Sequence, residues 1–116
     1  MNDIAYNLEK KRSEISLDSF SEMNFPDEVV EQFKFAFARS IDQFTSDYTQ
    51  ALKAKDFDRL SFLTHSILPN LKMLQLHSMV ELIKGYRDFD LEDPPAVHGI
   101  IEEIEAYRTV IKDFLG

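Results

Sequence analysis

Apolar side chains recur at three- and four-residue steps between residues 30 and 52, which is the spacing of one face of an α-helix. They are Val30, Phe33, Phe37, Ile41, Phe44, Tyr48 and Leu52. Pro26, followed by Asp27 and Glu28, marks the beginning, because proline is tolerated in a first helical turn and acids there complement the helix dipole. Lys53 and Lys55 suit the opposite end. The pattern predicts a long amphipathic helix from about residue 27 to the Lys53–Lys55 segment.

A second helix is expected after Asp56, whose side chain is a suitable N-cap. At about 100° per residue, its apolar residues cover a sector of roughly 80°. They are Leu60, Leu63, Ile67, Leu71 and Leu74. We expect this stripe to be buried, because aliphatic side chains gain most by packing together. The apolar pattern continues through Met79, Leu82 and Ile83, so we predict one helix that ends near Gly85.

The remaining sequence predicts short helices before these two and one long helix after them. The stretch up to Met23 is weakly patterned, with room for one or two short helices. Residues 88–95 form an acidic loop closed by Pro94 and Pro95, which can open a helix but cannot lie within one. The last helix is marked by Val97, Ile100, Ile101, Ile104, Tyr107, Ile111, Phe114 and Leu115.

These elements predict an all-α fold, and more specifically an antiparallel four-helix bundle over residues 16–116 with a short, helical N-terminal extension over residues 1–15. The composition agrees with one helical core. Hydrophobic residues make up 44% of the 116-residue chain and include ten Phe, while three Gly and four Pro are few for a turn-rich β fold.

Charge and cysteine content exclude several classes of partner and site. The formal net charge of −8 opposes binding to nucleic acid or to anionic lipid. The absence of cysteine excludes disulfides and thiolate zinc sites. No apolar run approaches the length of a membrane span, and the N-terminus lacks the apolar stretch of a secretory signal. We expect a soluble, cytoplasmic protein that binds neither nucleic acid nor membrane.

His65 is the residue that points most directly to chemistry. It lies about 160° from the centre of the apolar stripe of its helix, so its imidazole is expected to project away from the core. Histidine is partly neutral and nucleophilic near pH 7. An outward imidazole on a rigid helix is therefore positioned to act on another protein.

An apolar patch is expected around His65. Phe62, Pro69, Met73 and Leu76 lie within about 80° of it on the helical wheel. Exposed apolar residues grouped in this way often mark a docking surface. Two alternatives stand beside this interpretation. The N-terminal segment with Ile4, Tyr6 and Leu8 can cover part of the patch, or Met73 and Leu76 can turn inward.

From Ser16 to Leu115 the chain resembles histidine-containing phosphotransfer (HPt) domains. The resemblance rests on a short leading helix around Leu17 to Phe20, the long helix, the turn Lys53 to Phe57, and the run Arg59 to His65, which looks like the segment before the phosphorylated histidine of the family. Family members often follow that histidine with an aliphatic residue, a lysine and a small residue or proline. Here these positions hold Ile67, Leu68 and Pro69, so the lysine is replaced, and Gln75 stands where a glycine is usual.

The resemblance implies that His65 accepts a phosphoryl group from, or passes it to, the aspartate of a response-regulator receiver domain or a hybrid histidine kinase. The partner receiver supplies its own Mg²⁺, and the chain itself needs no cofactor and is no autonomous enzyme. Lys72 is a candidate counter-charge in place of the missing lysine, or else a solvated surface lysine. Ser66 is a weaker phosphoryl-stabilising candidate.

A second hypothesis is a degenerate HPt-like helical bundle that binds a receiver or kinase as an adaptor without being phosphorylated. The lost lysine and glycine favour it, and the retained His65 opposes it. No metal site is expected, because His77 and His98 share no helical ligand spacing with His65.

Overall fold

The computed structural model describes residues 3–116, and the part of the chain that it describes is helical and contains no strand. The elements are α1 (Asp3–Glu14), α2 (Asp18–Glu22), α3 (Asp27–Lys53), α4 (Phe57–Met73), α5 (His77–Lys84), the 3-10 helix η1 (Gly85–Asp88) and α6 (Pro94–Leu115). The predicted all-α fold is confirmed. No helix within residues 3–116 has both the length and the apolar character that crossing a membrane requires.

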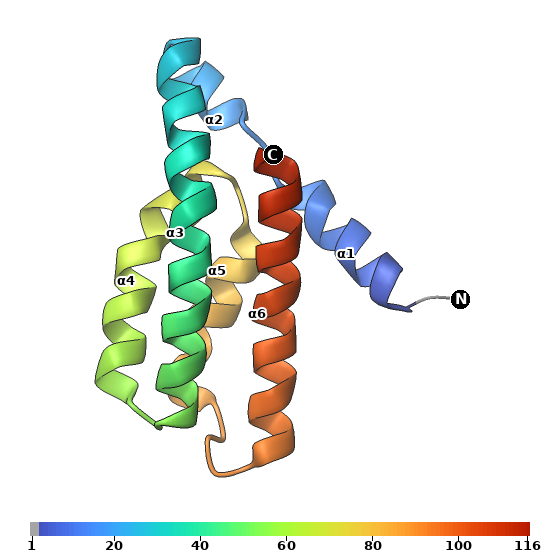
Figure 1. Cartoon of the computed structure of the whole chain (residues 1–116), viewed down its shortest axis with the longest axis vertical. Coiled ribbons are helices and arrows are strands. Elements are labelled where there is room, and N and C mark those ends of the chain that lie inside the picture. The colour runs from blue at the N-terminus through green and yellow to red at the C-terminus, as the bar shows by residue number, and fades with distance from the viewer. Residues whose placement is uncertain (1–2) are drawn as a thin grey trace.

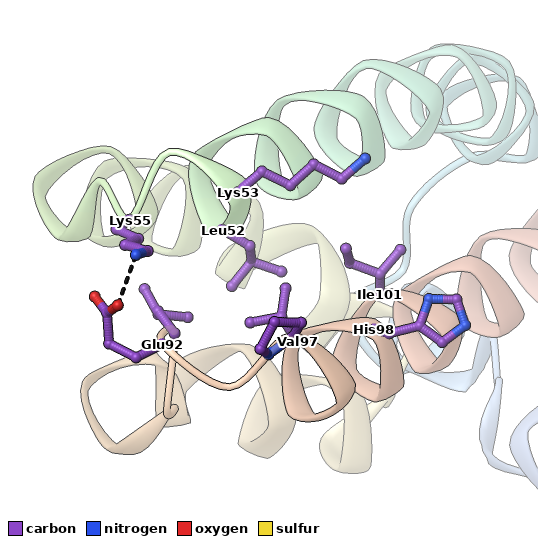
Figure 2. Close-up of a pocket in the computed structure, with 9 residues that line it drawn as sticks. Leu52, Lys53, Lys55, Glu92, Val97, His98 and Ile101 are labelled. Carbon is purple, nitrogen blue, oxygen red and sulfur yellow. Dashed lines mark hydrogen bonds and ion pairs between the residues drawn. The ribbon is translucent and has the colours of Figure 1, made fainter.

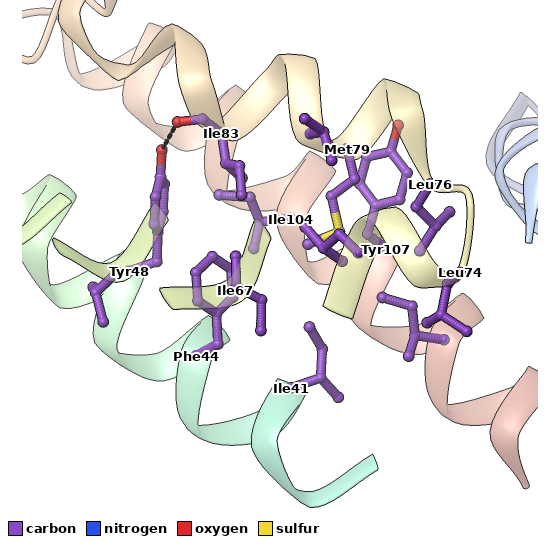
Figure 3. Close-up of a cluster of buried hydrophobic side chains, with 14 of the residues drawn as sticks. Ile41, Phe44, Tyr48, Ile67, Leu74, Leu76, Met79, Ile83, Ile104 and Tyr107 are labelled. Carbon is purple, nitrogen blue, oxygen red and sulfur yellow. Dashed lines mark hydrogen bonds between the residues drawn. The ribbon is translucent and has the colours of Figure 1, made fainter. Parts of the chain in front are cut away.

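Figure 1 shows α3 between α4 and α6, with α5 behind them and α1 on the outer side of α6. The long helix α3 keeps its predicted bounds, and its N-terminal part extends beyond the ends of α4 and α6. There α2 packs its Phe20 ring against Phe33, with ring centroids 4.8 Å apart. The core lies between α3, α4, α5 and α6 (Figure 3).

The predicted continuous helix from Asp56 to Gly85 is wrong, because the chain breaks between Met73 and His77. Gln75 adopts the left-handed conformation, with φ of 60°. The Leu76 amide donates to the Leu71 carbonyl and the Gln75 amide to the Lys72 carbonyl, which is the Schellman pattern of a helix end. The prediction failed because glycine, the usual residue at this position, is absent.

The same cap ends α2 and α3, again without glycine. Asn24 and Lys55 take the left-handed position, with φ of 59° and 58°. After Lys55 the chain enters α4 at once, where the Asp56 carboxylate accepts a hydrogen bond from the Arg59 amide at 3.0 Å. The predicted N-cap at Asp56 is therefore confirmed, and it fixes where α4 begins.

Buried polar groups tie the helices together. The hydroxyl of Tyr48 on α3 and that of Thr64 on α4 both donate to the carbonyl oxygen of Ile83 on α5, at 3.0 and 3.3 Å. At the outer side of α6, Lys11 of α1 is buried and pairs with Glu103 at 2.8 Å. Burial with satisfied partners makes these contacts specific, since an unpaired buried polar group would cost free energy.

Candidate functional site

His65 lies in the middle of α4 and is exposed. All five residues of the predicted apolar stripe on this helix are buried, which confirms the orientation derived from the helical wheel. Thr64, the residue before His65, is anchored to Ile83 of α5. The helix that carries the imidazole is thus held by its opposite face, and the imidazole itself is open to solvent.

The residues after His65 differ in where they place their side chains. Pro69 is exposed and lies inside α4, which continues to Met73. Because proline has no N–H, it cannot donate to the carbonyl oxygen of His65, four residues earlier. Leu68, at the position where the resemblance to HPt domains leads one to expect a lysine, is half-buried against the core. That position therefore supplies no charge beside the imidazole.

The two phosphoryl-stabilising candidates occupy different environments. Lys72 is exposed and has no ion-pair partner among residues 3–116. It lies about 10.5 Å along the helix axis from His65, which a long side chain leaning toward the N-terminus can partly span. The Ser66 hydroxyl already donates to the Phe62 carbonyl at 2.9 Å. Its proton is therefore engaged within the helix.

The predicted docking patch is smaller than the sequence indicated. Phe62 is 61% exposed and Pro69 is also exposed, whereas Met73 is half-buried. Leu76 is fully buried, and its inclusion in the patch is wrong. It turns inward because the Schellman cap reverses the chain at Gln75 and brings Leu76 into the core.

The N-terminal segment lies elsewhere. Helix α1 packs against α6, on the side of α3 opposite to α4 (Figure 1). Tyr6 is exposed and Leu8 packs against the core, while the side chain of Ile4 is outside the described residues. The part of α1 whose side chains are described therefore leaves Phe62 and Pro69 uncovered.

A polar hollow of about 350 Å³ lies beside the same helix and was missed by the sequence interpretation. Its lining residues are Phe57, Asp58, Ser61, Tyr86 and Arg87. Ser61 is one helical turn, about 6 Å, before His65 and lies on the same side of α4. Arg87 of η1 therefore shares a hollow with Ser61, which lies one helical turn before His65.

Tyr86 joins the two elements of this hollow. The Nε of Arg87 donates to the Tyr86 hydroxyl oxygen at 3.3 Å. The Ser61 hydroxyl and, after it, the Arg87 guanidinium lower the pKa of the Tyr86 phenol by stabilising its ionised form. Periodicity gave no signal for Tyr86 and Arg87, because they follow Gly85, where the sequence predicted only that a helix ends.

The other two histidines lie apart from this site. His77 begins α5, and His98 on α6 has its Nε2 2.9 Å from the Glu102 carboxylate. Within residues 3–116, His, Asp and Glu side chains form no group of three or more that can hold a metal ion. Comparison with known proteins found no matching family model, no matching curated protein and no matching solved structure. The case for function therefore rests on the geometry of this face of α4.

Proposed function

We propose that this chain is a histidine phosphotransfer protein, with His65 as the phospho-accepting residue and α3, α4, α5 with η1, and α6 as an HPt-like four-helix bundle. The observation that carries the proposal is the exposed imidazole at the centre of a helix whose opposite face is buried. Exposed Phe62 and Pro69 beside it leave an apolar surface on which a receiver domain can dock.

In the proposed reaction, Nε2 of neutral His65 attacks the phosphorus of an aspartyl phosphate on the receiver. The P–N bond forms as the P–O bond to the aspartate breaks, and the electron pair leaves with the carboxylate. The Nδ1 proton is released to solvent. The receiver, with its own Mg²⁺, neutralises most of the charge on the transferring group. The role of this chain is to present the nucleophile rigidly.

Arg87 and Lys72 are two cations among the described residues that can assist on the side of this chain. Arg87 lines the hollow together with Ser61, which is one turn before His65 on α4. Lys72 lies about two turns after His65 on the same helix. A guanidinium binds phosphoryl oxygens more specifically than an ammonium does, through paired hydrogen bonds. We expect Arg87→Ala to slow transfer more than Lys72→Ala.

The adaptor hypothesis is favoured by a specific observation. Leu68 packs its side chain against the core at the position where the family carries a lysine. A bundle that has lost this charge can still present Phe62 and Pro69 to a receiver.

The experiment incubates the purified chain with phosphorylated receiver domains from the same organism and follows acid-labile, alkali-stable label. Wild type, His77→Gln and His98→Gln should accept the label, and His65→Gln should not. The two control variants remove an exposed histidine elsewhere. Binding of a receiver without transfer of label would establish the adaptor function instead, and absence of both binding and label would overturn the proposal.

A further inference from the structure

A groove runs between α3 and α6, away from the face that carries His65. Two adjoining hollows, of about 440 and 490 Å³, make up the groove and share Lys53 as a lining residue. At one end Asp42 receives hydrogen bonds from Arg108 Nε at 2.7 Å and Lys112 Nζ at 2.6 Å. At the other end Lys55 pairs with Glu92 at 2.7 Å. Ion pairs therefore bound the groove at both ends.

The floor of the 490 Å³ hollow, which adjoins the pair of Lys55 with Glu92, is apolar. Figure 2 shows Leu52 of α3 and Val97 and Ile101 of α6 grouped between the two helices. Leu91 and Pro94 complete the apolar lining. Volumes of this size suit a small molecule, and an apolar floor stabilises a hydrocarbon body through burial of its surface.

The 440 Å³ hollow, which adjoins Asp42 and Arg108, contains polar groups with unused hydrogen-bonding capacity. Thr45 and Thr49 line it, and the buried hydroxyl of neither residue has a hydrogen-bond partner in the described part of the chain. Thr45 is only 2% exposed. These two residues and Lys53 are spaced four apart, so they form one line on the face of α3 that borders the groove. Buried hydroxyls without partners are uncommon and call for an explanation.

The charges along the groove leave one cation uncompensated. Asp42 and Glu105 balance Arg108 and Lys112, and Glu92 balances Lys55. Lys53 has no ion-pair partner within residues 3–116, in a chain whose net charge is −8. An occupant that matches this arrangement carries a single negative charge next to an apolar body.

We propose that the groove binds an amphipathic monocarboxylate, a molecule with an aliphatic or aromatic body and one carboxylate. The carboxylate pairs with Lys53 Nζ, and the Thr49 hydroxyl donates its proton to a carboxylate oxygen once its side chain rotates toward the groove. The apolar body lies on Leu52, Val97 and Ile101. This site is independent of the proposed phosphotransfer, because it uses neither α4 nor η1.

Octanoate is the first probe, followed by the amide signals of ¹⁵N-labelled protein in NMR spectra. We expect saturable shifts confined to residues on both sides of the groove, and no comparable shifts with octylammonium, whose charge is reversed. Affinity should rise about twofold per methylene from hexanoate to octanoate. A fully buried methylene would raise it about fourfold, and the gain is smaller here because the groove is open on one side.

Variants separate this site from general surface binding. Lys53→Gln should weaken octanoate binding about fivefold, as expected for loss of one exposed ion pair. Thr49→Val should weaken it by a similar factor. The matched control Lys10→Gln removes an exposed lysine on α1 and should leave the affinity unchanged. Equal responses to octanoate and octylammonium, shifts scattered over α1 and α4, or unchanged affinity in Lys53→Gln would each overturn the proposal.

Discussion

The carbonyl oxygen of Ile83 accepts hydrogen bonds from two other helices, and this makes the energetics of helix packing measurable. Tyr48 is fully buried and donates to it at 3.0 Å (Figure 3), and Thr64 is 2% exposed and donates at 3.3 Å. Tyr48→Phe and Thr64→Val each remove one donor and keep nearly the same shape. Each single variant leaves the carbonyl one side-chain donor.

Each single substitution should lower the free energy of unfolding by about 1 kcal/mol, the usual net value of one hydrogen bond. The double variant removes both side-chain donors from a buried carbonyl. We therefore expect it to lose about 3 kcal/mol, roughly 1 kcal/mol more than the two single losses together. A loss of this size is a large part of the stability of a small domain.

Urea unfolding followed by circular dichroism measures these differences, provided that the four proteins unfold in two states with the same dependence on urea. Strictly additive losses, or a double variant no less stable than either single variant, would refute the shared role of the Ile83 carbonyl. Thr45→Val is the matched control. Thr45 is as buried as Thr64, but its hydroxyl has no partner among the described residues, so its replacement should raise stability by about 1 kcal/mol.

Three further predictions concern the helix ends, alkaline pH and α1. Lys55→Gly should raise the free energy of unfolding by about 0.5–1 kcal/mol in urea titrations, because glycine relieves the left-handed backbone and the exposed pair with Glu92 contributes little. Burial raises the pKa of the Tyr48 phenol, so the folded chain holds this proton more tightly than the unfolded chain does. The free energy of unfolding should therefore fall as pH rises above 10. Urea titrations below and above pH 10 should show a smaller fall for Tyr48→Phe than for wild type. Lys11→Ala removes the buried ammonium that pairs with Glu103, so amide exchange in α1 should accelerate about thirtyfold, equivalent to a loss of about 2 kcal/mol, while the core of α3 keeps its protection.

The face of α4 that carries His65 was largely predictable from the sequence. Five aliphatic residues at helical spacing determine which side of the helix is buried, and the exposed position of His65 follows from the angle between it and that stripe. The same rule failed for Leu76. Helical geometry no longer applies after Gln75, where the backbone is left-handed. The sequence has no glycine there, so it carries no signal that the helix ends.

Residues brought together from different helices were not predictable. The hollow beside His65 joins Ser61 of α4 to Arg87 of η1, and the groove joins Thr49 and Lys53 of α3 to Ile101 of α6. Periodicity describes one helix at a time, so it carries no information on which face of a second helix lies opposite.

The sequence by itself determined the helical class, the bounds of α3, the presence of a long last helix, the N-cap at Asp56 and the outward position of His65, since each depends on contacts within a few residues along one helix. Only the tertiary structure decided the break after α4, the inward turn of Leu76, the packing of α1 on α6 and the shared acceptor at Ile83. These features depend on contacts between helices that are distant in sequence. Such helices bury one another's apolar surface and supply hydrogen-bond partners for one another's polar groups, and these contacts form only when the helices pack.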